Sequence, residues 1–273
     1  MDGATLNEAL RTGRSVVGTL IVSPSPHWLR AAATLGLDFV FIDTEHIALD
    51  RGQLAWMCQA YDAINVAPLV RIPAPDPYRA TMALDGGARG IIVPYVEDAE
   101  QVRRLAGAVK RKPLKGRVLQ EAMFGAAPLP AALSDYLADL NRANSLIVNV
   151  ESRPALEALD EILAVEQLDA VLIGPHDLSC SLGVPEAYDH PAFLDAVAEI
   201  IGSARARNVA VGIHAFDPIT LERELAWIAQ GATLIVHGSD LSAFVSALRP
   251  ALAAIREATG AAPEASSDAS LTI

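Results

Sequence analysis

Short apolar runs alternate with longer amphipathic runs along most of the 273-residue chain. The short runs are rich in Val, Ile, Leu and Phe and contain few polar positions, which is typical of parallel strands that are buried on both faces. Eight such runs predict strands at Ser15–Val22, Phe39–Asp43, Ala67–Arg71, Gly90–Pro94, Leu146–Glu151, Ala170–Gly174, Val209–His214 and Thr233–Gly238.

The amphipathic runs between these segments have the spacing of helices. Asp50–Ile64 repeats apolar residues at helical spacing, and Asp98–Val109 and Asp217–Gln230 each start with an acidic residue suited to capping. Pro218 then falls at the predicted first helical position. Strand–helix alternation repeated eight times predicts an α/β protein with a single-domain (β/α)₈ TIM barrel. A doubly wound open sheet is the alternative, but no Gly-x-Gly-x-x-Gly turn follows the first predicted strand.

Two stretches interrupt this alternation. Lys110–Leu133 is first basic and then rich in Ala and Pro, which predicts a long loop between the fourth and fifth strands, either functional or a plain surface excursion. The last stretch, 259–273, is rich in Ala, Ser, Pro and Glu and is expected to be a disordered tail. The barrel domain is accordingly expected to cover residues 1–258.

The composition narrows the class of protein. Hydrophobic residues make up 52% of the chain and charged residues 20%, which is enough apolar material for a large core. The net charge of -12 disfavours nucleic acid and anionic membranes as partners. The sequence has no leader of the secretory type and no apolar run near the ~20 residues of a membrane-spanning helix. We therefore expect a soluble, cytoplasmic protein.

Ionisable residues collect at the ends of the predicted strands, where barrels of this kind build their active sites. An apolar core has no use for such groups, and helix capping explains only single members such as Asp177 or Asp240. The strand-end segments are Asp43–His46, Arg71, Asn149–Glu151, Gly174–Asp177, His214 and His237.

Glu151 and Asp177 are the predicted metal ligands. Two carboxylates from neighbouring strand ends supply the hard oxygen ligands that Mg²⁺ or Mn²⁺ prefers, with Co²⁺ and Zn²⁺ as alternatives. A 2-oxo acid that replaces two waters of such an ion would have its enolate stabilised when the adjacent carbon–carbon bond breaks. The alternative is a structural ion pair of Glu151 with Arg153 or Arg71.

His46 is the predicted acid/base residue, because the pKa of a free imidazole lies near neutral pH. Asp43, three residues earlier, is close enough to orient that imidazole or a water molecule. Arg71 is predicted to place a positive charge on an oxyanion of the substrate, and the alternative is an ion pair with Asp43 or Glu45. His176, His214 and His237 are further candidates for the lining of the pocket.

The lysines favour metal chemistry over imine chemistry. A Schiff-base aldolase needs a desolvated lysine inside the barrel. The chain has three lysines, Lys110, Lys112 and Lys115, and all of them follow the fourth predicted strand.

Several of these segments resemble the HpcH/HpaI aldolase family, the class II pyruvate aldolases, over about Leu6–Ala258. An Asp-x-Glu-His piece followed by a Gly-Pro-x-Asp-Leu-Ser piece is a specific signal. The resembling segments are Phe41–His46, Pro68–Arg71, Leu84–Ala88, Ile92–Pro94, Val150–Arg153 and Ile173–Ser179.

The resemblance implies a (β/α)₈ barrel with a divalent metal ion on Glu151 and Asp177. It implies acid/base catalysis by His46 with support from Asp43, and stabilisation of an enolate by Arg71. Members are typically hexamers in which a C-terminal helix is exchanged between subunits.

The resemblance also implies contacts to the substrate. Backbone N–H groups around Gly174, His176 and Asp177 would bind the carboxylate of pyruvate, and Asp85 resembles a residue contributed across an interface to a neighbouring site. Asn149 stands where a longer glutamine is usual, and His176 replaces a small residue. These departures border the pocket rather than the metal, so they leave the reaction class standing but put the usual aldehyde and dicarboxylate substrates in question.

Together these features predict a class II aldolase that reversibly cleaves a 4-hydroxy-2-oxo acid to pyruvate, or an analogue, and an aldehyde. One alternative is a related metal-dependent lyase, decarboxylase or biosynthetic enzyme of malyl or citryl type that forms a carbon–carbon bond. Another is a non-catalytic barrel that binds a 2-oxo acid as a sensor or scaffold. The expected assembly is a homo-oligomer, a hexamer by resemblance.

Overall fold

A closed parallel barrel forms the body of the molecule. The computed structural model describes residues 1–125 and 128–260, so the predicted tail lies almost wholly outside the described residues. Neighbouring strands pair in chain order and β1 pairs with β8, which confirms the predicted TIM barrel. The strands are β1 (Val16–Leu20), β2 (Phe39–Asp43), β3 (Ala67–Arg71), β4 (Gly90–Val93), β5 (Ser145–Val150), β6 (Ala170–Ile173), β7 (Ala210–Ala215) and β8 (Leu234–Ser239).

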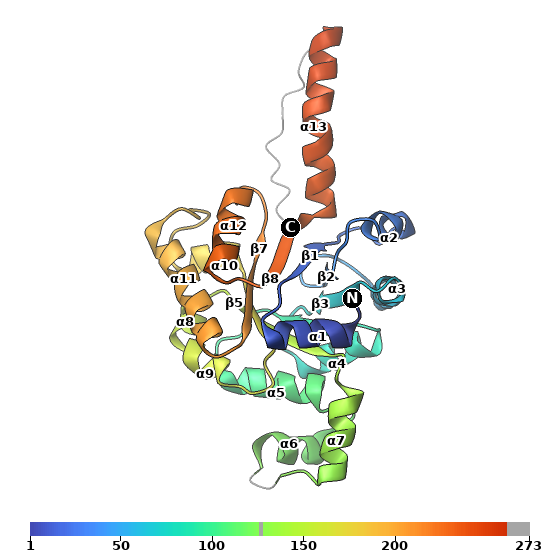
Figure 1. Ribbon diagram of the computed structural model, residues 1–273, viewed down its shortest axis with the longest axis vertical. Helices are drawn as coiled ribbons and strands as arrows, with labels where there is room; N and C mark the ends of the chain where they lie inside the picture. The colour runs from blue at the N-terminus through green and yellow to red at the C-terminus, as the bar shows by residue number, and fades with distance from the viewer. Residues whose placement is uncertain (126–127, 261–273) are drawn as a thin grey trace.

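Helices surround the barrel and account for most of the remaining chain (Figure 1). They are α1 (Gly3–Thr12), α2 (Pro26–Ala32), α3 (Arg51–Ala63), α4 (Pro77–Asp85), α5 (Ala99–Lys110), α6 (Gly116–Phe124), α7 (Ala131–Leu140), α8 (Arg153–Glu157), α9 (Leu159–Leu163), α10 (Pro175–Ser181), α11 (Pro191–Ala206), α12 (Leu221–Gln230) and α13 (Asp240–Thr259).

Side-chain caps fix where several helices begin. Asp50 and Asp98 accept hydrogen bonds from the third residue of α3 and of α5, so the helices expected there are confirmed. The expected start of the helix at Asp217–Gln230 was wrong. Thr220 is the residue that caps α12, by accepting from the N–H of Arg223, and Pro218 lies in the turn before it.

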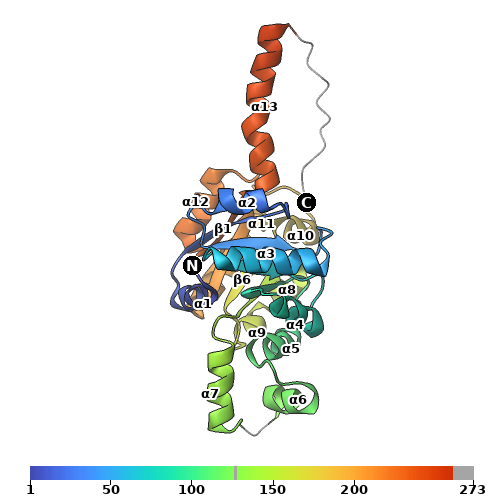
Figure 2. The same cartoon turned by 90° about the vertical axis from the view of Figure 1, so that its right-hand side faces the viewer.

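The stretch predicted as a long loop is largely helical. It contains α6 and part of α7, which lie at the end of the molecule opposite α13 (Figures 1 and 2). Met123 of α6 packs closely over Gly107 of α5, where the absence of a side chain allows the approach. The expectation of a loop was wrong. The Ala- and Pro-rich composition of the stretch is typical of a loop, although the stretch also includes the short amphipathic helix α6.

Alternation along the strands divides the apolar core into two layers. Residues such as Phe41 and Leu69 fill the lumen together with one face of α1, whereas residues such as Val70 pack against the surrounding helices. The lumen side of β2 and β3 ends at Asp43 and Arg71, which are paired in register. The fold therefore directs these polar side chains into the mouth of the barrel.

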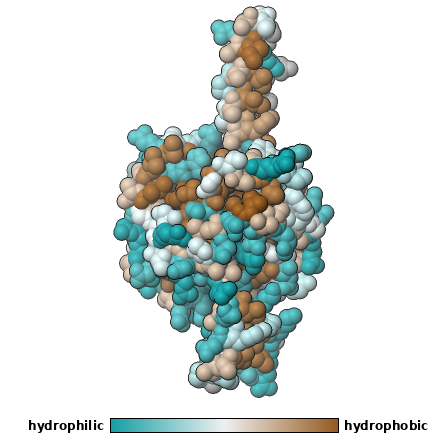
Figure 3. Space-filling model, turned by 45° about the vertical axis from the view of Figure 1, so that its right-hand side comes forward, coloured by the Kyte–Doolittle hydropathy of each residue, from teal (hydrophilic) through white to brown (hydrophobic). Residues whose placement is uncertain are grey.

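Helix α13 leaves the body after β8 and projects away from it in both ribbon views (Figures 1 and 2). Phe244, Leu248, Leu252 and Ile255 recur along it at helical spacing and are exposed, and the space-filling view shows apolar surface along the helix (Figure 3). An apolar stripe of this length is typical of a contact with a partner. Among the described residues, no helix combines the length and apolarity needed to cross a membrane.

Candidate active site

Neighbouring strand ends bring four of the predicted site residues to one mouth. Asp43 and Arg71 end β2 and β3, and Glu151 and Gly174 directly follow β5 and β6. The carboxylates of Asp43 and Glu151 are both buried, which is unusual for acids and requires specific partners. The two acids satisfy this requirement in different ways.

Asp43 is held by Arg71. The guanidinium donates from Nε to Oδ1 at 2.8 Å and from Nη2 to Oδ2 at 2.7 Å, and its Nε lies 3.1 Å from Oε2 of Glu45. Burial alone would raise the pKa of Asp43, but the bonds and charge of Arg71 outweigh burial and lower that pKa. Arg71 also lies over the ring of Phe41, 5.3 Å from its centroid.

Asp43 also contacts the backbone of the turn that carries His46. Besides the two bonds from Arg71, its Oδ2 accepts from the backbone N–H of His46 at 3.4 Å, and its Oδ1 accepts from the N–H of Glu45 at 2.9 Å. The imidazole of His46 instead has Nε2 3.6 Å from Oε2 of Glu45. The carboxylate of Asp43 therefore contacts Arg71 and the following turn, while Glu45 is the acid beside the imidazole, and the predicted support of His46 by Asp43 remains a prediction.

Glu151 is bonded by neutral donors. Its Oε1 accepts from the backbone N–H of Tyr95 at 2.8 Å, and its Oε2 accepts from Nδ2 of Asn149 at 2.8 Å. No arginine forms an ion pair with it among the described residues, so the alternative of a structural pair with Arg71 or Arg153 is not what the structure contains. Burial raises the pKa of Glu151 to about 7.

Gly174 allows Glu151 to occupy its position. A Cβ atom on Gly174 would lie 2.5 Å from Oε2 of Glu151, far closer than real contacts. The predicted role of Gly174 in binding substrate remains a prediction, but the structure gives it a steric role beneath the carboxylate.

Asp177 is the second predicted metal ligand. It lies in the first turn of α10, is exposed, and receives no hydrogen bond on its carboxylate from any residue that the structure describes. Its charge adds to the rise in the pKa of Glu151, so the two carboxylates are within electrostatic reach of each other. Both are available on the same side of the mouth.

A divalent cation fits this acidic pair. Each oxygen of Glu151 accepts one bond and so retains a lone pair that a cation could use, and a positive charge there would offset the burial that raises the pKa of this carboxyl. In the described ranges no cluster of three or more His, Cys, Asp or Glu residues is suited to a metal ion. Water and substrate would therefore complete the coordination, which suits Mg²⁺ or Mn²⁺.

The side chain of His176 lies beside Glu186 and Cys180. Its Nδ1 lies 3.7 Å from Oε1 of Glu186, and its Nε2 lies 3.9 Å from Sγ of Cys180. A substrate contact at His176 would therefore come from its backbone. The predicted contact itself remains a prediction.

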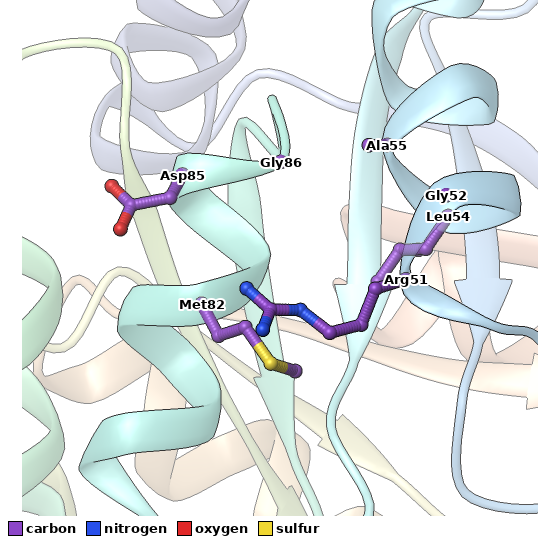
Figure 4. Close-up of a pocket in the computed structure, with 7 residues that line it drawn as sticks. All are labelled: Arg51, Gly52, Leu54, Ala55, Met82, Asp85 and Gly86. Carbon is purple, nitrogen blue, oxygen red and sulfur yellow. The ribbon is translucent and has the colours of Figure 1, made fainter.

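The structure does not bring Asp85 to the mouth of its own barrel. Asp85 ends α4 in the outer layer, forms an ion pair with Lys112, and lines a cavity of about 280 Å³ between α3 and α4. Figure 4 shows its carboxylate pointing away from the Arg51 guanidinium, which extends over Met82. Its predicted contribution to a neighbouring subunit remains a prediction.

The other two candidate histidines have different surroundings. His214 ends the lumen side of β7, and burial lowers its pKa to about 4. His237 is exposed on the outer side of β8, where its Nδ1 lies 2.7 Å from Oε2 of the buried Glu224. Only His214 therefore lines the lumen.

Tyr95 is a site residue that the sequence did not reveal. It follows β4 with φ of 56°, a left-handed conformation that directs its N–H to Glu151. A hydrogen bond to Glu45 raises the pKa of the Tyr95 hydroxyl to about 12. Its place two residues past the end of β4 was the available signal, but an aromatic side chain there suggests no chemistry.

Comparison with known proteins identifies the family. Residues 18–247 match the HpcH/HpaI aldolase/citrate lyase family. The chain belongs to this family. A 2-keto-3-deoxy-L-rhamnonate aldolase of Salmonella gallinarum is 35% identical over 241 residues, which cover 88% of this chain and 89% of the relative. The relative of the same description from Klebsiella pneumoniae is 35% identical over 239 residues, 88% of each chain.

Two solved structures resemble this chain over almost its whole length. The HpcH/HpaI aldolase from Desulfitobacterium hafniense has a TM-score of 0.80 and 28% identity, covering 94% of this chain and 99% of that one. The citrate synthase SbnG has a TM-score of 0.79 and 30% identity, covering 93% and 98%. The resemblance inferred from the sequence motifs is therefore confirmed.

Proposed function

We propose that this protein is a divalent-metal-dependent aldolase that cleaves a 4-hydroxy-2-oxo acid of the 2-keto-3-deoxy sugar acid type to pyruvate and an aldehyde. The observation that carries the proposal is the buried carboxylate of Glu151, which lies within electrostatic reach of Asp177 and Arg71 and accepts its hydrogen bonds from neutral donors, with no cationic side chain of the described residues paired to it. Relatives 35% identical to this chain that are described as aldolases for such an acid support the substrate class.

The positions of the lysines support metal chemistry. Lys110 forms an ion pair with Asp169, the residue before β6, at the end of the barrel opposite the mouth. Lys112 pairs with Asp85 in the outer layer, and Lys115 precedes α6. None of the three can form an imine with a substrate bound near Glu151, so another electron sink is required.

Each polar side chain of the mouth has a role in this reaction. Glu151 and Asp177 would hold the cation, which when bound supplies the positive charge that stabilises the enolate of pyruvate. Arg71, fixed by two bonds to Asp43, presents a second positive charge to a substrate oxygen. His46 is half-exposed at the rim and takes the proton from the 4-hydroxyl group as the bond to the aldehyde carbon breaks.

Pyruvate release tests the proposal directly. The purified protein is incubated with a 2-keto-3-deoxy sugar acid, first after chelation and dialysis and then after addition of Mg²⁺ or Mn²⁺. We expect pyruvate only when the metal is restored. Full activity after complete metal removal, or trapping of a lysine adduct by borohydride, would contradict it.

Synthesis of a carbon–carbon bond is a second candidate. It is favoured by the similarity to the citrate synthase SbnG, which is 30% identical in sequence over an alignment that covers 93% of this chain. Incubating the metal-loaded protein with oxaloacetate or pyruvate and a panel of carbonyl acceptors separates the two. Turnover with oxaloacetate but not with aldehydes would favour the synthase.

Helix α13 supports the expectation of a homo-oligomer. Its exposed stripe of Phe244, Leu248, Leu252 and Ile255 projects from the body, where no part of the described chain covers it (Figure 3). Exchange of this helix between subunits, as expected for a hexamer, would bury the stripe. Light scattering of the full chain and of a Leu248→Glu variant tests the assembly.

A further inference from the structure

The imidazole of His214 enters the lumen at the level of the candidate metal site. Ala210, four residues earlier on β7, belongs to the lumen layer, and alternation places His214 on the same side. The register of β5, β6 and β7 aligns the residues just before Glu151, Gly174 and His214. These three residues therefore stand side by side around the mouth.

The ring of His214 is fixed in orientation and in protonation. It packs edge-on against Phe41, with centroids 5.6 Å apart, and against Phe216, with centroids 5.4 Å apart. Its Nε2 lies 3.2 Å from the carbonyl oxygen of Gly238. A carbonyl oxygen only accepts, so Nε2 carries the hydrogen and Nδ1 carries a lone pair.

The lone pair on Nδ1 is available to a ligand. No described residue donates to it, and His214 as a whole is half-buried rather than fully enclosed. Burial of the ring lowers the pKa of His214 to about 4, and the positive charge of Arg71 contributes to this fall. Near neutral pH the imidazole is therefore an uncharged acceptor.

We infer that His214 is a specificity-determining residue, whose Nδ1 accepts a hydrogen bond from a hydroxyl group on the aldehyde half of the substrate. The inference rests on the proposed aldolase function and names the class of aldehyde: hydroxylated, sugar-derived aldehydes rather than alkyl aldehydes. His214 acts by binding and takes no part in the proton transfers.

The chemistry of the two substrate halves decides which half His214 contacts. Pyruvate carries a carboxylate, a keto oxygen and a methyl group, none of which donates a hydrogen bond to an acceptor such as Nδ1. Hydroxyl donors occur only on the carbons that leave as the aldehyde. Arg71 and His214 both lie against the ring of Phe41, so a substrate whose oxygen contacts Arg71 extends past the imidazole.

Two aldehydes of equal length test the inference in the direction of synthesis. The full chain, loaded with Mn²⁺, is given pyruvate with either glyceraldehyde or propanal, which differ by two hydroxyl groups, and kcat/KM is measured for each. The variants are His214→Leu, which removes the acceptor, and His214→Asn, which keeps a side-chain oxygen as acceptor. His27→Leu, at an exposed position on α2, is the matched control.

We expect the wild type to prefer glyceraldehyde. His214→Leu should lower kcat/KM for glyceraldehyde by about 10-fold, the effect of losing one neutral hydrogen bond, and leave the value for propanal nearly unchanged. His214→Asn should recover part of the preference, and His27→Leu should change neither value. An equal loss for both aldehydes, or a preference that survives in His214→Leu, would overturn the inference while leaving the aldolase function intact. A wild type that condenses pyruvate with neither aldehyde and releases none from a 2-keto-3-deoxy acid would overturn both.

Discussion

The two sides of the barrel mouth differ in their electrostatic balance. On the β2–β3 side, Asp43 receives two bonds from Arg71, and its pKa is lowered. On the β5–β6 side, Glu151 receives bonds only from an amide side chain and a backbone N–H, and its pKa is raised to about 7. Both acids are buried, so burial does not explain the difference.

The comparison separates an acid that is paired with a cationic side chain from two acids that are not. Arg71 neutralises Asp43 within the chain itself, and the pairing fixes the guanidinium in place as a preorganised hydrogen-bond donor. Glu151 and Asp177 have no such partner among the described residues and are expected to obtain it from a divalent ion. Four substitutions test this distinction, in order of decreasing expected effect.

Asp177→Ala removes one of the two unpaired carboxylates on the β5–β6 side. We expect loss of Mn²⁺ binding by calorimetry and a fall in kcat/KM of about 10³-fold or more, with an unchanged circular dichroism spectrum, because cation stabilisation of the enolate is lost. The matched control is Glu186→Gln, which removes a nearby exposed carboxylate that faces His176. Retained Mn²⁺ binding in Asp177→Ala would remove this residue from the metal site.

Arg71→Lys disturbs the ion pair with Asp43 on the β2–β3 side. A lysine cannot donate the two parallel bonds to Asp43, so we expect kcat/KM to fall by about 10²-fold while Mn²⁺ affinity is largely kept. Arg89→Lys is the control, because Arg89 makes the same two-bond pair with Asp62 away from the mouth. That control should lose up to ~1 kcal/mol of unfolding free energy and keep its activity. A similar loss of activity in both variants would argue against a special role for Arg71.

Gly174→Ala crowds the Glu151 carboxylate on the β5–β6 side without removing a charge. The added Cβ would displace the Glu151 carboxylate, so we expect Mn²⁺ affinity to fall by about 10-fold. Gly202→Ala on α11 meets open space and should instead raise the unfolding free energy by roughly 0.5–1 kcal/mol. Titration with Mn²⁺ and thermal unfolding distinguish the two, and an unchanged Mn²⁺ affinity in Gly174→Ala would place the ion elsewhere.

His176→Ala should have the smallest effect. Its imidazole faces Glu186 and Cys180, whereas a substrate contact there would use the backbone N–H, which alanine keeps. We expect kcat/KM to change by less than about 3-fold. A larger loss in steady-state kinetics would show that the imidazole enters the site.

The sequence was most informative where local pattern and global packing agree. Strands β2 to β7 are buried along almost their whole length and read as nearly continuous apolar runs, and the number of such runs, eight with β1 and β8, led to the barrel. The motif around Asp43–His46 and that around Gly174–Ser179 led to the family. The start of α12 was misplaced, because Asp217 and Pro218 also suit a helix start and Thr220 is the cap that forms.

The partners within the site depend on register and could not be read from sequence spacing. Asp43 is three residues from His46 but bonds the side chain of Arg71, which is 28 positions away and directly opposite in the sheet. The N–H of Tyr95 reaches Glu151 through one left-handed residue. The roles predicted for the site residues and the metal remain predictions for the experiments above.

The distribution of the two cysteines makes the site accessible to spectroscopy. Cys58 is buried, and its pKa is raised to about 12, so its thiol resists alkylation, whereas Cys180 is exposed on α10, one helical turn from Asp177. A maleimide spin label would therefore attach selectively at Cys180 without any engineered mutation. Paramagnetic Mn²⁺ bound beside Asp177 would broaden the spectrum of that label, and the native chain would report the arrival of its own metal ion.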